Sequence, residues 1–336
     1  IPSCPVATNI DVSVGDDAMD SQIDDKKITI GENEEIDGDV KTAAGSNAQI
    51  AIKKGATVTG DIIADGKIDI EENSEIGGSV EIREGSNGSN QIAIGKRGIV
   101  AGDIIADGKI DIEANNEIGG GVEIREGSNG SNQIAIGKRA TVAGGVIADG
   151  KIDIEANSEI GGSVKIREGS NGSDQIAIGE SGAVCGSVIA DGKIDIEKNV
   201  GVGGDVKIRE GSNGSNQIAI GEDAKISGGV IADGKIDIEK NVGVGGDVQI
   251  REGSNGSNQI AIGEDARISG DVIADGKIDI EKNVEVGGDI KTRAGSNANI
   301  EIGEFATITG GVVPDGGFSI KNSVTIKGDD PRPSGS

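Results

Sequence analysis

Apolar and polar residues alternate along most of this chain in short runs, and the runs recur at a fixed spacing. Two similar halves, such as residues 67–82 and 91–106, make up one repeat unit. The string IADGKIDIE marks successive units at a step of forty-two positions, beginning at Ile63, Ile105, Ile147, Ile189, Ile231 and Ile273. Strict alternation, as in Ile68-Asp69-Ile70, is typical of a short strand with one buried face. The pattern therefore predicts an all-β protein built from tandem repeats.

The elementary unit of the repeat is a coil of eighteen positions. Counted from Lys67 as position 1, both halves carry apolar residues at positions 2, 4, 10, 14 and usually 16, with glycine at position 12. One half returns directly to position 1, whereas the other first takes up an inserted GSNGSN segment such as 85–90. Three short strands per coil predict a three-sided β-solenoid (β-helix) whose coils stack at about 4.8 Å. The coil starts from Lys27 to Gly317 predict about 15 coils and a rod of roughly 70 Å.

Charged residues at two coil positions test this stacking. If the coils stack in sequence, equivalent positions become neighbours, and like charges should not meet. Position 6 alternates in sign through Glu180, Lys198, Glu222, Lys240, Glu264, Lys282 and Glu304. Position 17 alternates through Arg83, Asp107, Arg125, Asp149, Arg167, Asp191, Arg209, Asp233, Arg251 and Asp275. The ladders predict one register, in which Lys240 lies between Glu222 and Glu264.

The repeat divides the chain into a solenoid over residues 27–328, an N-terminal arm over 1–26 and a polar tail over 329–336. The arm contains Asn-Ile-Asp-Val-Ser-Val at 9–14, a half-buried strand pattern that we do not place in the coil register. One hypothesis is that this strand completes the unfinished end of another subunit by strand addition. The alternative is that the arm folds back as the cap of its own chain. The residues that would carry strand addition are Ile10, Val12 and Val14.

The C-terminal coil is incomplete, because residues 317–328 supply only part of a turn. An uncovered solenoid end exposes strand edges that can accept another chain. The two phenylalanines of the sequence fall in the last two coils, and we expect them to plug the end of the core or to contact a neighbouring subunit. The predicted assembly residues at this end are Phe305, Phe318, Ile320, Val324 and Ile326.

The chain has two cysteines, Cys4 in the arm and Cys185 at position 11 of the eighth coil. Position 11 holds the small residues Ala101, Ala143, Ser227 and Ser269 in other coils, so drift among small side chains is one interpretation of Cys185. The other is an intermolecular Cys4–Cys185 disulfide that would link subunits covalently. The inserted loops match the N-glycosylation pattern Asn-Gly-Ser at Asn87, Asn129, Asn171, Asn213 and Asn255.

Composition narrows the class of function. The chain has 59 Gly, two Phe and no His, Trp or Tyr, which favours a thin, regular core of Ile, Val and Ala. A net charge of −26 argues against binding nucleic acid or anionic membranes. No apolar stretch approaches the ~20 residues of a membrane-spanning helix. No coil breaks the pattern to build a cleft, so we expect no catalytic residues and no cofactor.

Position 3 carries aspartate in alternate coils, as in Asp69, Ala93 and Asp111. The simpler interpretation is that this spacing relieves repulsion between carboxylates. An alternative is a row of weak Ca²⁺ sites shared with neighbouring molecules, because carboxylates bind hard cations. We do not predict a defined metal site.

The segments ITIGENEEIDGDV (28–40) and ATVTGDIIADGKIDIE (56–71) make the chain similar to bactofilins, the polymer-forming bacterial solenoids. The resemblance covers about residues 27–328 as a style of repeat. It implies a right-handed triangular solenoid whose ends stack into filaments without polarity, and it carries no catalytic residues. The chain departs from the family in its length and its regular GSNGSN loops. Left-handed hexapeptide solenoids show similar runs, so handedness stays open, but their acyltransferase chemistry uses a histidine, which this chain lacks.

These observations predict a structural subunit that assembles head to tail with itself into an extracellular filament or surface fibre. We expect an extracellular or cell-surface location, because removal of a secretion signal would explain the start at Ile1; trimmed numbering is the alternative explanation. Bactofilins are cytosolic, so the location does not come from the resemblance. The alternative function is a monomeric or surface-anchored adhesin, or another ligand-binding solenoid. An enzyme is the least favoured class.

Overall fold

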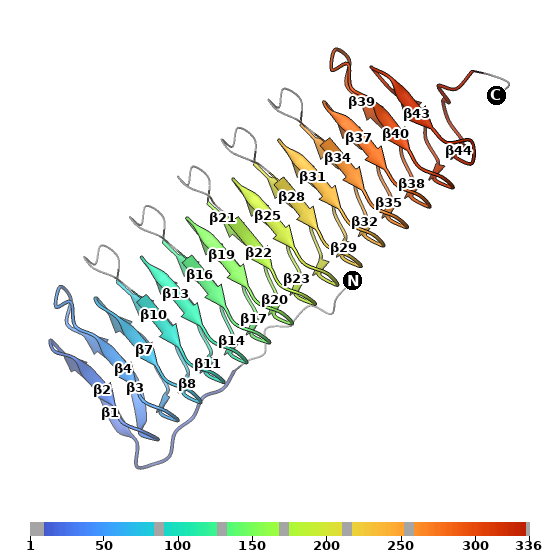
Figure 1. The fold of residues 1–336 in the computed structure, drawn as a ribbon. Coiled ribbons are helices and arrows are strands. Elements are labelled where there is room, and N and C mark those ends of the chain that lie inside the picture. Colours follow the sequence, from blue (N-terminus) through green and yellow to red (C-terminus); the bar gives the residue numbers. More distant parts are fainter. Residues whose placement is uncertain are drawn as a thin grey trace. The chain divides into compact units, whose positions relative to one another are not determined.

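The computed structural model describes residues 10–83, 91–125, 133–167, 175–209, 217–251 and 259–333. Every element in these ranges is a β-strand (Figure 1). The chain divides into two compact units. The N-terminal unit comprises Ser3–Asp174 and Gly182–Gly186, and the C-terminal unit comprises Ile1–Pro2, Gln175–Ser181 and Ser187–Ser336.

Each coil of the N-terminal unit has three sides. Strands of the first side are β2 (Ile28–Ile30), β4 (Ile50–Ile52), β7 (Ile68–Ile70), β10 (Gln91–Ile94), β13 (Lys109–Ile112), β16 (Gln133–Ile136) and β19 (Lys151–Ile154). Strands of the second side are β5 (Thr57–Val58), β8 (Glu75–Ile76), β11 (Ile99–Val100), β14 (Glu117–Ile118), β17 (Thr141–Val142), β20 (Glu159–Ile160) and β23 (Ala183–Val184). Strands of the third side are β6 (Ile62–Ala64), β9 (Val80–Ile82), β12 (Ile104–Ala106), β15 (Val122–Ile124), β18 (Val146–Ala148) and β21 (Val164–Ile166). In the first coil, β3 (Glu35–Thr42) spans the second and third sides, and β1 (Met19–Asp24) precedes it.

The C-terminal unit repeats this arrangement. Strands of its first side are β22 (Gln175–Ile178), β25 (Lys193–Ile196), β28 (Gln217–Ile220), β31 (Lys235–Ile238), β34 (Gln259–Ile262), β37 (Lys277–Ile280), β40 (Ile300–Ile302) and β43 (Phe318–Ile320). Strands of its second side are β26 (Gly201–Val202), β29 (Lys225–Ile226), β32 (Gly243–Val244), β35 (Arg267–Ile268), β38 (Glu285–Val286), β41 (Thr307–Ile308) and β44 (Thr325–Ile326). Strands of its third side are β24 (Val188–Ala190), β27 (Val206–Ile208), β30 (Val230–Ala232), β33 (Val248–Ile250), β36 (Val272–Ala274), β39 (Ile290–Thr292) and β42 (Val312–Val313).

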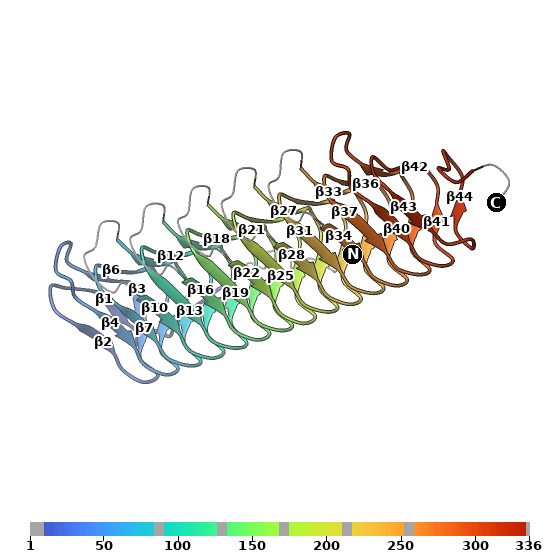
Figure 2. The same cartoon turned by 45° about the horizontal axis from the view of Figure 1, so that its top comes forward.

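All strand pairs within each unit are parallel, and equivalent coil positions face each other. Ile50 pairs with Ile68, Ile68 with Ile92, and Ile92 with Ile110, so the short and long steps of the repeat alternate. Figure 2 shows the successive strands of this side lying next to one another. The longer step leaves the register unchanged, because the inserted residues lie between strands. The all-β solenoid predicted from the repeat is therefore confirmed.

The core consists of columns of β-branched side chains. Ile68, Ile92 and Ile110 at position 2 are completely buried, and the columns at positions 4, 10 and 14 are built in the same way. Burying one such side chain stabilises the fold by about 1.5–3 kcal/mol. Position 8 also points inward, which the sequence pattern did not indicate. Asn116 there is buried but satisfied, since it donates to the Glu113 carbonyl at 2.7 Å and accepts from the Gly98 amide at 2.7 Å.

Two corner positions explain the recurrent Asn, Asp and Gly residues. Position 7 adopts the left-handed conformation, with φ of 59° at Asn73 and 62° at Asn115, and Asn and Asp tolerate this region best after Gly. Position 12 is glycine because consecutive coils touch there. A Cβ on Gly78 would lie 2.6 Å from the carbonyl carbon of Gly60 in the preceding coil.

The N-terminal arm differs from the sequence-based expectation. Residues 10–14 form no strand here, so the predicted strand at this place is not observed, and Asn9 lies outside the described residues. The arm does contain a strand, β1, which pairs in parallel with β3 through Gln22 and Val40. Part of the arm thus folds back onto the first coil of its own chain.

Candidate functional site: charge ladders and end coils

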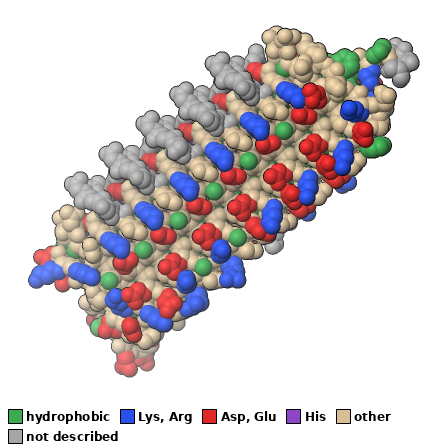
Figure 3. Space-filling view, in the orientation of Figure 1, with side chains coloured by type: hydrophobic (Ala, Val, Ile, Leu, Met, Phe, Trp, Pro, Cys, Tyr) green, Lys and Arg blue, Asp and Glu red, His purple; other side chains and the backbone are tan. Residues whose placement is uncertain are grey.

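The position-6 ladder lies on the surface of the coils in the predicted register. Lys240 forms an ion pair with Glu222 at 3.1 Å, and Lys282 forms one with Glu264 at 3.0 Å. The hydrogen bond to Glu222 raises the pKa of Lys240, and the charge of Glu264 on its other side raises it further. Lys240 therefore lies between the two glutamates, as predicted. The space-filling view shows rows of acidic and basic side chains along this surface (Figure 3).

The arginines at position 17 form a second ladder, here called the arginine ladder. Each guanidinium of this ladder contacts the aspartate of the preceding coil, as Arg125 does with Asp107 at 2.8 Å and Arg167 with Asp149 at 2.8 Å. These side chains are largely shielded from water, with 19% of Arg125 and 15% of Asp107 exposed. The same pairing recurs as Arg83–Asp65, Arg209–Asp191, Arg251–Asp233 and Arg293–Asp275.

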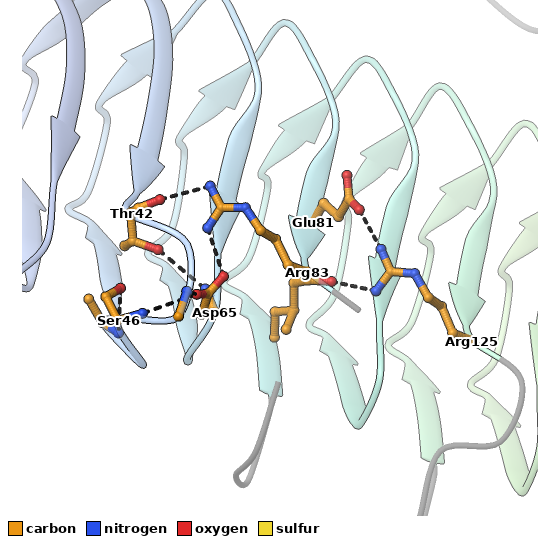
Figure 4. Close-up of polar contacts among 9 residues, drawn as sticks. Thr42, Ser46, Asp65, Glu81, Arg83 and Arg125 are labelled. Atoms are coloured by element: carbon orange, nitrogen blue, oxygen red, sulfur yellow. Dashed lines mark hydrogen bonds and ion pairs between the residues drawn. The ribbon is translucent and has the colours of Figure 1, made fainter. Parts of the chain in front are cut away.

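The arginines also reach a second coil, which the sequence did not predict. Arg125 donates to the Ile82 carbonyl at 2.5 Å and contacts Glu81, both two coils earlier (Figure 4). Arg83 likewise donates to the Thr42 carbonyl at 2.7 Å. One guanidinium therefore joins three consecutive coils, using the fork of donors that distinguishes Arg from Lys.

Asp65 begins the arginine ladder in a buried environment. Burial acts to raise the pKa of its carboxyl group, but hydrogen bonds from Arg83 and from the Gly45 amide outweigh burial. The pKa of Asp65 consequently lies below its ordinary value, and the carboxylate stabilises this corner in its charged form.

The aspartates at position 3 are paired within their own coils. Lys67 contacts Asp69 at 2.7 Å and Lys109 contacts Asp111 at 2.8 Å, so each carboxylate has an ammonium group two residues earlier. A divalent cation in this row would have to displace that ammonium group. In the part of the chain that the structure describes, no group of three His, Cys, Asp or Glu side chains could hold a metal ion. Weak Ca²⁺ binding shared with neighbouring molecules stays an alternative interpretation of this row.

Exposed large apolar side chains are confined to the end coils. Among the described residues they are Met19 (42% exposed), Ile23 (73%), Phe305 (64%), Val313 (46%) and Phe318 (42%). The first two belong to β1, and the other three belong to the last two coils. Phe305 does not plug the core, because it lies at corner position 7 with a φ of 60°. Phe318 stacks on Ile300 at a core position. None of the described residues packs on its other side, and 42% of Phe318 is exposed. Contact of either phenylalanine with a neighbouring subunit stays a prediction.

An open sheet edge lies at β2 in the N-terminal unit and at β43 in the C-terminal unit. Within the described ranges, β2 has only β4 as a strand partner and β43 has only β40. The other predicted C-terminal assembly residues lie here. Ile320 and Ile326 are half-buried and Val324 is 5% exposed. The last coil extends slightly further than expected, because the Asp329 carbonyl accepts a hydrogen bond from the Val312 amide at 2.8 Å.

The predicted residues of the arm are brought to neither open edge. Ile10, Val12 and Val14 are half-buried and belong to no strand. Their role in assembly stays a prediction.

Cys185 is half-buried and disulfide-bonded, and none of the described cysteines is free. Cys4 lies outside the described residues, as do the five Asn-Gly-Ser loop sites. The predicted bridge between subunits therefore stays a prediction.

Comparison with known proteins returns no relative. No family model matches the chain, and no curated protein or solved structure matches it. The described residues contain no helix that could cross a membrane. The class of protein is set by the fold alone, and it is a parallel β-solenoid of tandem coils.

Proposed function

We propose that this chain is a structural subunit that assembles head to tail with copies of itself into an extracellular filament. The observation that carries the proposal is that, among the described residues, every exposed large apolar side chain lies in β1 or in the last two coils. Burying one such side chain against a second copy would contribute about 1.5–3 kcal/mol. The other described coils of each unit present the position-6 ladder to water, so the attractive surfaces lie at β1 and in the last two coils.

The open strand edges give the contact its direction. An added strand gains backbone hydrogen bonds along an exposed edge. The described strand pairs within each unit are parallel. The open edge of the last coil can therefore pair in parallel with the open edge of the first coil of the next copy. The net charge of −26 opposes side-by-side packing of subunits and favours contact at the ends.

The remaining features support a structural role. Charged side chains of the described coils are used to hold neighbouring coils in register, as the Lys240 and Arg125 contacts illustrate. The bactofilin-like repeat supports polymer formation, and the disulfide at Cys185 supports an oxidising, extracellular location.

Sedimentation velocity and negative-stain microscopy test the proposal with two matched variants. Phe318→Asp places a charge on the open end, whereas Ser227→Asp places one on an exposed corner of an inner coil. We expect the wild type and Ser227→Asp to form filaments as concentration rises, and Phe318→Asp to stay monomeric. A wild type that remains monomeric throughout, or a Phe318→Asp variant that assembles equally well, would contradict the proposal.

Electrophoresis without reductant tests the bridge separately. An intermolecular Cys4–Cys185 disulfide predicts a ladder of covalent oligomers that collapses with thiol. Filaments that run as a single monomer band would remove the bridge and leave non-covalent assembly in place.

A further inference from the structure

The N-terminal end of the solenoid contains a partly built coil. β1 supplies the second and third sides of a coil that precedes Lys27, because it pairs in parallel with β3 from Met19–Ile36 to Asp24–Thr42. The first side of this coil would lie on the open edge of β2. No described strand occupies that place.

The sequence supplies a segment that fits the missing side. Ile10-Asp11-Val12 stands one full coil length before Ile28-Thr29-Ile30 and shares its alternation. The residues between these two segments preserve the coil spacing. Met19 pairs with Ile36, one position short of a coil length, whereas after the bulge Gln22 pairs with Val40, a full coil length away. The bulge therefore compensates one extra residue in the first corner, and the arm follows the coil register that the sequence alone did not reveal.

The open edge of β43 offers the matching surface at the C-terminal end. Phe318 and Ile320 occupy positions 2 and 4 of the last coil, on top of Ile300 and Ile302. Continued stacking would place Ile10 of a second copy against Phe318 and Val12 of that copy against Ile320. All four side chains would then face the core between two coils.

We propose that residues 10–14 form a strand between β2 of their own chain and β43 of a second copy. The inference rests on the proposed head-to-tail assembly and specifies its junction. The six residues from Cys4 to Ile10 span at most about 20 Å, less than the roughly 35 Å between an end coil and the eighth coil, so the strand requires that Cys4 is not bonded to Cys185. The proposed junction also explains why these residues are unpaired in a single chain. A strand added to β2 alone would leave Ile10 and Val12 with one side in water, whereas a second copy covers that side and supplies further hydrogen bonds.

Cysteine cross-linking tests the register in full-length protein carrying Cys4→Ser and Cys185→Ser. Asp11→Cys and Ser319→Cys would occupy position 3 of adjacent strands, at a Cα separation of about 5 Å, which a disulfide can bridge. We expect this pair to give a ladder of disulfide-linked oligomers. The matched pair Ser13→Cys and Ser319→Cys is two residues out of register, beyond about 7 Å, and should stay monomeric on the gel.

Two results would overturn the inference. A ladder from Thr29→Cys with Ser319→Cys, but not from Asp11→Cys with Ser319→Cys, would show β2 meeting β43 directly. Head-to-tail assembly would survive that result. The absence of a ladder from every pair would also refute the strand, and sedimentation of the unmodified chain would then decide whether assembly itself occurs.

A second pair of variants compares the junction with an inner coil. In this register Ile10 points into the junction, whereas Ser227 is exposed at a corner of an inner coil. We expect Ile10→Asp to raise the critical concentration for assembly about tenfold or more, and Ser227→Asp to change it less than about threefold. Equal effects of the two substitutions would contradict the placement of Ile10 in the junction.

Discussion

Replacing Arg125 by glutamine tests whether the arginine ladder holds neighbouring coils together. The substitution removes the 2.8 Å contact to Asp107, the 2.5 Å hydrogen bond to the Ile82 carbonyl and the contact to Glu81. The partners belong to the two preceding coils, so the loss should be felt across three coils. Glutamine keeps the aliphatic stem but cannot span both coils with one planar group.

The loss of stability in Arg125→Gln can be estimated from the hydrogen bonds and ion pairs that Arg125 makes. A hydrogen bond to a charged group contributes about 1.5–3 kcal/mol when it is shielded from water. Arg125 and Asp107 keep 19% and 15% of their side-chain surface exposed, which places the loss at the lower end, about 2 kcal/mol. Since about 1.4 kcal/mol is a factor of ten, opening of these coils should become roughly 30-fold more frequent.

Hydrogen exchange measured by mass spectrometry gives the local readout. Exchange should accelerate by this factor in peptides from residues 80–83, 104–107 and 122–125, and stay unchanged in the C-terminal unit. Arg97→Gln is the matched control, because Arg97 is 54% exposed and contacts Asn73 and Glu72 at the surface. Such pairs contribute about 0–1 kcal/mol. Equal exchange in the two variants would refute the role given to the arginine ladder.

Four further substitutions have definite expected outcomes. Ile110→Ala, in a fully buried column, should lower the free energy of unfolding by about 2–5 kcal/mol in denaturant titrations followed by circular dichroism. Ile320→Ala, in the half-buried last coil, should cost less than half of that; equal losses would contradict the open end. The folded-state pKa of Asp65 lies below its ordinary 3.8, so its stabilising effect is complete above that value and is lost as pH falls through the folded pKa. Asp65→Asn should therefore have a lower free energy of unfolding at pH 7, and its stability should fall less than that of the wild type as the pH is lowered. The same dependence of stability on pH in both proteins would show that the ion pair between Asp65 and Arg83 does not stabilise the fold. Phe305→Asn should stabilise the fold by about 1 kcal/mol, because Phe305 has a φ of 60°, which asparagine tolerates better, and a lower melting temperature would contradict this.

The stacking could be predicted from the sequence because it depends on spacing. Lys240 lies between Glu222 and Glu264 since equivalent positions of a regular coil are neighbours whatever the details of the corners. The pairing of Arg125 with Asp107 follows from the same rule. The hydrogen bond from Arg125 to the Ile82 carbonyl does not follow from this rule, because it depends on how the long side chain passes the intervening coil.

The ends could not be predicted in the same way, because there the repeat no longer has a neighbour on each side. Phe318 occupies a core position and reads as buried in sequence, yet it is exposed in the last coil. The arm was assigned no place in the register because the pairing of β1 with β3, including its bulge, has to be known before residues 10–14 can be aligned. The inward direction of Asn116 was missed because polar, small and apolar residues share position 8.

Cryo-electron microscopy of assembled wild-type protein tests head-to-tail assembly most directly. The map should show β-layers about 4.8 Å apart that continue across the boundary between two chains. The last coil, with Phe318, should lie next to the coil that contains β1 of the following copy. Particles that remain single chains under all assembly conditions, or chains packed side by side with both ends free, would contradict the account.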